Sequence, residues 1–217
     1  MSTPERRSYD ARRRRERAEA EKRATRTRVV EAAHALFVER GYRATTITDI
    51  ARAAGVAVQS VYNVAASKSE LLHLAVDLAV AGDDDPVRMT ERADIERIAA
   101  TADPEQQLAQ IAALITTIQT RSATIQSAYR EAAAVDASVA DRLAADQRRR
   151  HETFSAVVAM LPAERLRVPL ADAVDTVWAV GSHEVFMLTR TSLEWDEDRF
   201  RAWLARTLID ALLVPTP

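Results

Sequence analysis

The spacing of apolar residues predicts that the chain begins its fold with an amphipathic helix. Val29, Ala33, Leu36 and Phe37 recur three and four residues apart, which places them on one face of a helix. Gly41 follows as a stop signal, because glycine readily adopts the left-handed conformation in which many helices end. A surface helix with one apolar face needs a partner to cover that face.

Short helices follow this first one. Thr46 and Asp49 have the spacing of a capping box, in which each side chain accepts a hydrogen bond from the other residue's backbone. We therefore expect a second helix to begin there. Gly55 supplies a tight turn, and a third helix is predicted over residues 58–64. A fourth is predicted over residues 68–81.

The remainder of the chain predicts longer helices. The acidic run at residues 83–86 ends in proline and breaks the fourth helix. The last helix has the clearest amphipathic stripe, with Phe200, Leu204 and Leu208 spaced by four. The predicted helices cover residues 90–101, 104–120, 122–134, 137–161, 170–190 and 196–213.

Composition adds an all-α fold class and a division of charge. The chain has only 4 Gly and is rich in helix-forming Ala and Leu. Its net charge of −2 combines 15 Lys and Arg against 8 Asp and Glu in residues 1–68 with 15 against 24 in the rest. A basic head favours contact with a polyanion, although solvated charged faces remain the alternative. Three regions are expected: a basic, flexible arm (1–24, with four Arg at 12–15), a small helical domain (25–68) and a larger helical domain (69–217).

Several classes of function are excluded by what the sequence lacks. It contains no cysteine, so disulfides, thiolate metal sites and cysteine nucleophiles are ruled out. His151 and His183 each precede a glutamate, but neither has the second histidine that a zinc-protease motif needs. No glycine-rich phosphate loop, secretory signal or membrane-length apolar run is present. We expect no enzyme activity, no metal and no cofactor, in a cytoplasmic protein with no membrane partner.

Residues 46–68 have the layout of a DNA-reading helix-turn-helix. Such a motif needs a bracing helix, a turn with a small residue, and a second helix slim enough for the major groove. Val61 anchors the second helix, and Gln59 and Asn63 project amides that can pair with base edges. We expect phosphate contacts from Thr46, Tyr62 and Lys68 and base contacts from Val58, Gln59 and Asn63, with Thr48 and Ser60 completing the DNA-binding set.

At these positions the chain resembles the TetR family of regulators. The resemblance covers residues 25–72 without a gap. Ala57 departs from it, since the family usually has Ser or Thr at this helix cap, and so do Val64 and Ala65, where relatives often carry His or Tyr and then Phe. The matching residues are Ala32, Ala33, Leu36, Phe37, Gly41, Tyr42, Thr45, Thr46, Ile47, Ile50, Ala51, Ala54, Gly55, Val56, Val61, Tyr62, Ser67, Lys68 and Leu71.

The resemblance implies a mechanism and partners. It implies a two-fold homodimer joined by a four-helix bundle from the last two helices of each subunit. It also implies that a small-molecule effector in the body spreads the DNA-reading heads and releases a palindromic operator. Two alternatives stay open: a helical ligand-binding or enzymatic protein with a vestigial head, and an Arg-rich architectural DNA binder without an effector.

Two sets of large side chains in the body are candidates for these roles. Both sets have the same alternative, which is the ordinary core of a single chain. Candidates for the ligand pocket are Tyr129, Met160, Trp178, His183, Phe186 and Met187. Candidates for the dimer interface are Val174, Val177, Val185, Phe200, Trp203, Leu204, Leu208 and Leu212.

Overall fold

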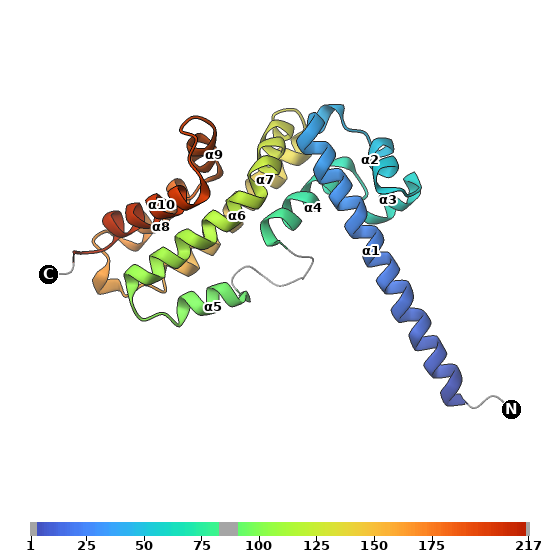
Figure 1. Cartoon of the computed structure of the whole chain (residues 1–217), viewed down its shortest axis with the longest axis horizontal. Helices are drawn as coiled ribbons and strands as arrows, with labels where there is room; N and C mark the ends of the chain where they lie inside the picture. Colours follow the sequence, from blue (N-terminus) through green and yellow to red (C-terminus); the bar gives the residue numbers. More distant parts are fainter. Residues whose placement is uncertain (1–3, 83–90, 216–217) are drawn as a thin grey trace. The chain divides into compact units, whose positions relative to one another are not determined.

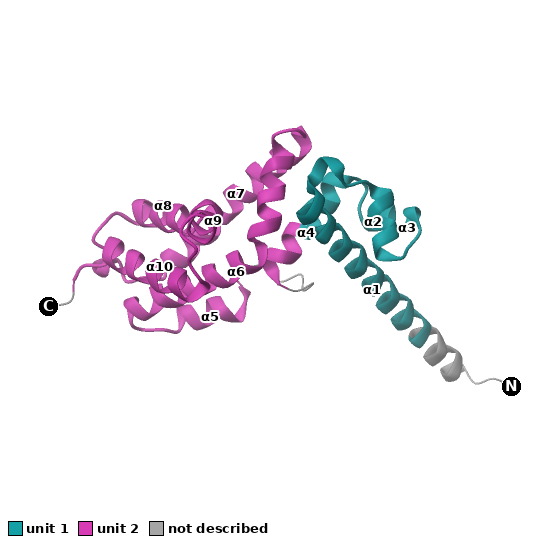
Figure 2. Ribbon diagram, turned by 45° about the horizontal axis from the view of Figure 1, so that its top comes forward, with its two compact units in different colours: residues 1–75 teal, residues 76–217 magenta. Residues whose placement is uncertain are grey.

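The computed structural model describes residues 4–82 and 91–215, with side chains from residue 13 onward. Within these ranges the chain is helical and has no strand beyond one isolated bridge between Leu166 and Leu213, which confirms the predicted all-α fold. It forms two compact units, residues 1–75 and 76–217, coloured separately in Figure 2. Each unit is described by itself below.

The first unit contains three helices and the first half of a fourth. Helix α1 packs against α2 and α3, which also pack against each other. The predicted apolar stripe of α1 is buried, with Val29, Ala33 and Phe37 fully covered. This unit extends to residue 75, beyond the expected boundary at residue 68, because the start of α4 with buried Leu71 and Leu72 belongs to it. The helices are α1 (Pro4–Ala44), α2 (Ile47–Ala54), α3 (Val58–Val64) and α4 (Lys68–Ala81).

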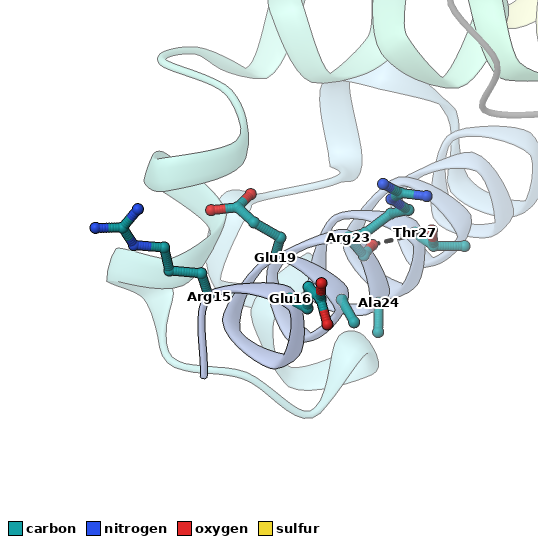
Figure 3. Close-up of a pocket in the computed structure, with 7 residues that line it drawn as sticks. Arg15, Glu16, Glu19, Arg23, Ala24 and Thr27 are labelled. Atoms are coloured by element: carbon teal, nitrogen blue, oxygen red, sulfur yellow. Dashed lines mark hydrogen bonds between the residues drawn. The ribbon is translucent and has the colours of Figure 1, made fainter. Parts of the chain in front are cut away.

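Helix α1 reaches much further toward the N-terminus than the apolar pattern predicts. Residues 4–24, expected to be a flexible arm, continue the helix in the structure. The segment is rich in Arg, Ala and Glu, which favour helix without a buried face, and Lys22 pairs with Glu19 one turn away at 3.0 Å. A shallow hollow on this part of α1 is lined by residues of this one helix (Figure 3), so it is part of a helix surface.

The second unit is organised around the long helix α6 (Figure 1). Helix α6 packs most extensively against α10 and also contacts α5, α7 and α9, while α8 packs on α7 and α10. The acidic run at residues 83–86 lies outside the described residues. The helices are α5 (Ala93–Ala99), α6 (Pro104–Ala133), α7 (Ala137–Val158), α8 (Leu170–Val180), α9 (His183–Thr191) and α10 (Glu197–Leu212), with a 3-10 turn, η2, at Ala163–Arg165.

Two helix boundaries in this unit differ from the prediction. The expected helices 104–120 and 122–134 are one continuous helix, α6, since no residue at the junction breaks it. The expected helix 170–190 is divided into α8 and α9. There the Ser182 side chain caps α9 by accepting a hydrogen bond from the Val185 amide. Gly181 lies at the break, where a Cβ would approach both the Val177 carbonyl oxygen and Ile115 Cδ1 of α6 to 2.9 Å, so a larger residue would force one of them to shift.

The apolar stripe of α10 lies in the core of the second unit. Phe200, Leu204, Leu208 and Leu212 each have 0% exposed surface in the single chain. Side chains that the single chain already covers have little surface left for a second copy. The structure therefore gives no support to the expected dimer interface at these four residues or at the buried Val174 and Val177 of α8, and that interface stays a prediction. Val185 and Trp203, the other two candidates, are partly exposed.

Candidate nucleic-acid interface and a buried polar cluster

The turn between α2 and α3 is fixed by local hydrogen bonds. The predicted capping box is present: the Asp49 amide donates to Thr46 Oγ1 at 3.1 Å, and the Thr46 amide donates to Asp49 Oδ2 at 3.2 Å. Hydrogen bonds that the Thr46 hydroxyl and the Thr46 amide donate to the Asp49 carboxylate lower the pKa of Asp49. At the other end Gly55 has φ 66°, a left-handed conformation, and donates to the Ala51 and Arg52 carbonyls. Both ends of α2 are thus held, which sets the direction of α3.

Helix α3 has one buried face and one exposed face. Val61 is fully buried, whereas Val58 is 40% and Tyr62 47% exposed. Gln59 and Asn63 are also exposed, and Gln59 Nε2 donates to Asn63 Oδ1 over 3.3 Å. The outer face therefore carries a pair of pre-positioned amides, which are the groups that read adenine in the major groove. Of the remaining predicted contacts, Ser60 is partly buried and Thr48 is exposed on α2.

Lys68 has a structural role that its sequence position did not reveal. Its Nζ donates to the backbone carbonyls of Tyr42 at 2.9 Å and Thr45 at 3.2 Å, and lies 4.2 Å from the centre of the Tyr42 ring. Thr45, which is buried, donates its hydroxyl to the carbonyls of Leu36 and Gly41. Lys68 thus ties the start of α4 to the end of α1. Only one of its three N–H groups remains for a phosphate.

The start of α3 offers a direct test of helix capping. Ala57 has extended backbone at the N-cap position and makes no side-chain cap. Ala57→Ser supplies the missing acceptor, so we expect the unfolding free energy of the first unit to rise by about 1 kcal/mol. Urea denaturation followed by circular dichroism measures this. Ala57→Val, which adds bulk but no acceptor, is the control, and equal stability of the two variants would contradict the expectation.

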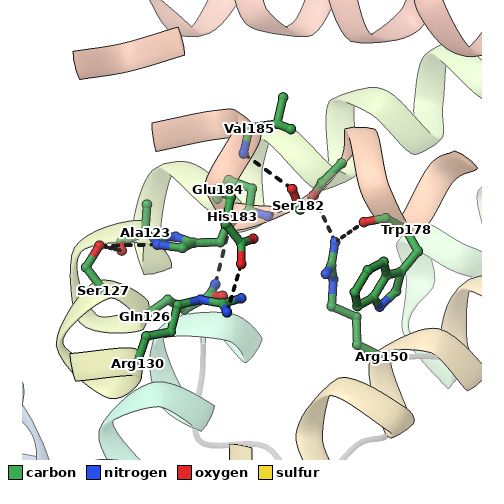
Figure 4. Close-up of polar contacts among 12 residues, drawn as sticks. Ala123, Gln126, Ser127, Arg130, Arg150, Trp178, Ser182, His183, Glu184 and Val185 are labelled. Carbon is green, nitrogen blue, oxygen red and sulfur yellow. Dashed lines mark hydrogen bonds and ion pairs between the residues drawn. The ribbon is translucent and has the colours of Figure 1, made fainter. Parts of the chain in front are cut away.

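A polar cluster lies inside the second unit where α6 and α7 meet the break between α8 and α9 (Figure 4). Arg150 of α7 donates through one nitrogen to the carbonyls of Trp178 at 3.1 Å and Gly181 at 3.0 Å. Gln119 of α6 donates to the same Gly181 carbonyl at 2.9 Å. We call this set, together with the four residues described next, the Arg150 cluster.

The other half of the Arg150 cluster is an ion pair beside a histidine. Arg130 of α6 pairs with Glu184 of α9 at 2.8 Å, and His183 Nε2 lies 3.2 Å from Ser127 Oγ. Burial lowers the pKa of His183, with the charge of Arg130 as a further cause, so this imidazole is neutral at pH 7. Burial also lowers the pKa of Arg150 to about 10, which still leaves its guanidinium charged at neutral pH.

The predicted pocket residues do not gather at one place. Trp178 and His183 belong to the Arg150 cluster. Tyr129 donates its hydroxyl to Asp146 at 3.0 Å, and burial raises its pKa. Phe186 stacks edge-on with Phe200 in the core at 4.9 Å. Met160 and Met187 are partly buried against the same core, and ligand contact by these residues stays a prediction.

Sequence reasoning missed Arg150, although the pattern contained a signal for it. Arg150, Phe154 and Val157 are spaced i, i+4 and i+7, so the arginine interrupts the apolar stripe of α7. Its position as the third of three consecutive arginines concealed this, because such a run suggests an exposed basic face.

Within the described ranges, no group of three His, Asp or Glu side chains is arranged to hold a metal ion. The helices described here include none that is long and apolar enough to cross a membrane.

Comparison with known proteins matches residues 29–75 to the family model described as bacterial regulatory proteins, tetR family. No curated protein matches the chain. Among solved structures, NalD of Pseudomonas aeruginosa, the secondary repressor of the MexAB-OprM multidrug efflux pump, is similar with 22% identity and TM-score 0.65 over 88% of this chain and 98% of that one. A proposed transcriptional regulator from Saccharomonospora viridis in complex with choline has 16% identity and TM-score 0.65 over the same shares. A TetR transcription regulator from Haloarcula marismortui has 18% identity and TM-score 0.64, again over 88% and 98%.

Proposed function

We propose, from the match of residues 29–75 to the tetR family model, that the chain is a TetR-family transcriptional regulator: a cytoplasmic repressor released from a palindromic operator by a small-molecule effector. The observation that carries the proposal is the exposed face of α3, where Gln59 and Asn63 form an amide pair above the buried Val61. In the alternative hypothesis the DNA-binding head is vestigial, and nothing then requires an exposed amide pair on α3. Binding of DNA by the purified chain supports the repressor, and absence of DNA binding supports the vestigial head.

The contacts on DNA divide into two kinds. Gln59, Asn63 and Val58 face base edges, while Tyr62 and the remaining N–H of Lys68 reach phosphates. The Thr46 hydroxyl already donates a hydrogen bond to Asp49 Oδ2 at 2.5 Å within the capping box. It can therefore donate to a phosphate only if that hydrogen bond is broken. Thr48 and Ser60 complete the proposed contact set.

Gln59→Ala tests the base contact. The operator is first obtained by selecting bound sequences from a randomised DNA library. Against the selected operator and single-base variants of it, Gln59→Ala is expected to lose about 1–3 kcal/mol of discrimination at one base pair in each half-site. Fluorescence anisotropy at fixed salt measures the affinities.

Tyr62→Phe is the matched control on the same helix. It removes one hydroxyl from an exposed side chain, so it is expected to weaken all sequences by a similar factor. If Gln59→Ala lowered the affinity for the operator and for its single-base variants by the same factor, the predicted contact between Gln59 and a base would be wrong.

Two copies of the chain are required for this function. One short helix reads only a few base pairs, too few to distinguish a single site in a genome. A two-fold dimer reads two half-sites about 34–36 Å apart. Because the α10 stripe is buried in the chain itself, we place the contact with the second copy at Leu188 and Leu193, which are 58% and 52% exposed at the end of α9. They are the two most exposed large apolar side chains in the described ranges.

The effector is proposed to bind in the second unit. The S. viridis regulator, which has a similar fold, was solved in complex with choline, which supports a small molecule as the partner proposed here. Binding must favour the DNA-free arrangement by a few kcal/mol for release to follow.

A further inference from the structure

The Arg150 cluster buries more positive than negative charge. Arg130 has Glu184 as its counter-ion at 2.8 Å. By contrast, no carboxylate in the described ranges forms an ion pair with Arg150, whose hydrogen bonds go to two backbone carbonyls. Since His183 is neutral, two guanidinium groups share one carboxylate. A buried charge without a counter-ion is unfavourable, and the cluster is one negative charge short of balance.

The same cluster contains hydrogen-bond donors that have no acceptor. Arg130 Nε and Trp178 Nε1 are buried and have no partner. Both atoms can only donate. The Nδ1 atom of His183, a residue with 5% exposure, is also without a partner. Native proteins leave few buried polar atoms unpaired, so this group points to a missing acceptor.

Aromatic rings flank the uncompensated guanidinium. The Arg150 Cζ lies 4.9 Å from the centre of the Phe154 ring and 5.5 Å from that of Trp178. These are the ring faces that a ligand cation would use. The chain's own Arg150 already occupies them, and its charge repels a second cation.

We propose that the Arg150 cluster is the effector site and that its ligand is a small organic carboxylate. A carboxylate would balance the excess positive charge at Arg150, and its oxygens would accept hydrogen bonds from Arg150 and from the unpaired Nε of Arg130. The planar guanidinium group also matches a carboxylate in shape. That this ligand acts as an effector rests on the proposed function. That a carboxylate binds at the Arg150 cluster rests only on the charge and the hydrogen-bond donors of the cluster.

The position of Arg150 connects this ligand to helix geometry. The Gly181 carbonyl at the break between α8 and α9 accepts hydrogen bonds from both Gln119 and Arg150. A carboxylate on Arg150 competes with that carbonyl and loosens one of the two bonds that hold the break. Helix α9, which starts two residues later, carries Leu188 of the proposed contact between copies.

Calorimetric titration of the full chain tests the ligand class. The probes are phenylacetate, 2-phenylethanol and 2-phenylethylammonium, which share one ring and differ in charge, with hexanoate as a carboxylate of different shape. We expect at least one carboxylate to bind at millimolar concentration or below, and the alcohol and the ammonium ion to bind at least tenfold more weakly. Absence of binding by both carboxylates, or equal binding of the neutral or cationic probe, overturns the proposal.

Three variants locate the site. Arg150→Gln should weaken carboxylate binding by about ten- to a hundredfold, while Arg149→Gln, which alters an exposed neighbour paired with Asp146, should leave it unchanged. Glu184→Gln removes the competing carboxylate from an exposed position, so binding should tighten by roughly two- to fivefold. The tighter binding expected for Glu184→Gln tests the site even if Arg150→Gln fails to fold, because removing a residue with only a structural role would not strengthen carboxylate binding. Weaker binding in Glu184→Gln contradicts the proposal.

Operator binding measured in parallel separates this inference from the proposed function. A carboxylate that binds and weakens operator binding supports both. A carboxylate that binds without affecting DNA supports the site and contradicts effector release. A chain that selects DNA sequences but binds neither carboxylate contradicts the site alone, and a chain that selects no DNA contradicts the proposed function.

Discussion

Replacing Leu188 and Leu193 together by glutamate is expected to convert the protein to monomers and to lower operator affinity on the order of a thousandfold. Both side chains are more than half exposed, so the substitution leaves the core of the chain intact. Two facing pairs of glutamates would replace apolar contact by charge repulsion between copies. Analytical ultracentrifugation measures the oligomeric state and fluorescence anisotropy the DNA binding.

Val135→Glu is the matched control, because Val135 is 44% exposed and lies in the turn between α6 and α7. It should leave both the oligomeric state and the DNA affinity unchanged. A Leu188→Glu, Leu193→Glu variant that remains dimeric would place the contact between copies elsewhere on the second unit.

Leu208→Ala is expected to lower the unfolding free energy by about 2–5 kcal/mol, since it removes a fully buried side chain from α10 and leaves a cavity against α6. Urea denaturation at several protein concentrations measures the loss. If Leu208 lies in the core of one chain, the loss is present at every concentration. If it lay between copies, the loss would appear as weaker assembly and would depend on concentration.

Ile209→Ala is the neighbouring control. Ile209 is only partly buried, so the same kind of truncation should cost less than at Leu208. Equal losses at the two positions, or a folded Leu208→Ala monomer with undiminished stability, would contradict the burial of this stripe within the single chain.

The parts of the first unit that sequence predicted correctly depend on residues close together in the chain. The capping box joins Thr46 to Asp49, only three residues apart, and Gly55 ends α2 through its own backbone conformation. The apolar stripe of α1 likewise follows from helical spacing alone. Where the determining contact is local, the residue types at fixed offsets decide the structure.

Features that depend on distant contacts were decided only by the tertiary structure. Lys68 finds its acceptors 26 and 23 residues away, and Arg150 finds Gly181 31 residues away, so neither role shows in local spacing. Gly181, at the break between α8 and α9, likewise lies close to Ile115, which is distant in the sequence.

The sequence by itself determined that α10 must bury an apolar face, because Phe200, Leu204, Leu208 and Leu212 repeat at helical intervals. Only the tertiary structure decided that this face is covered by the chain's own second unit. The physical reason is that the hydrophobic effect favours removal of apolar surface from water regardless of whether the same chain or a second copy covers it.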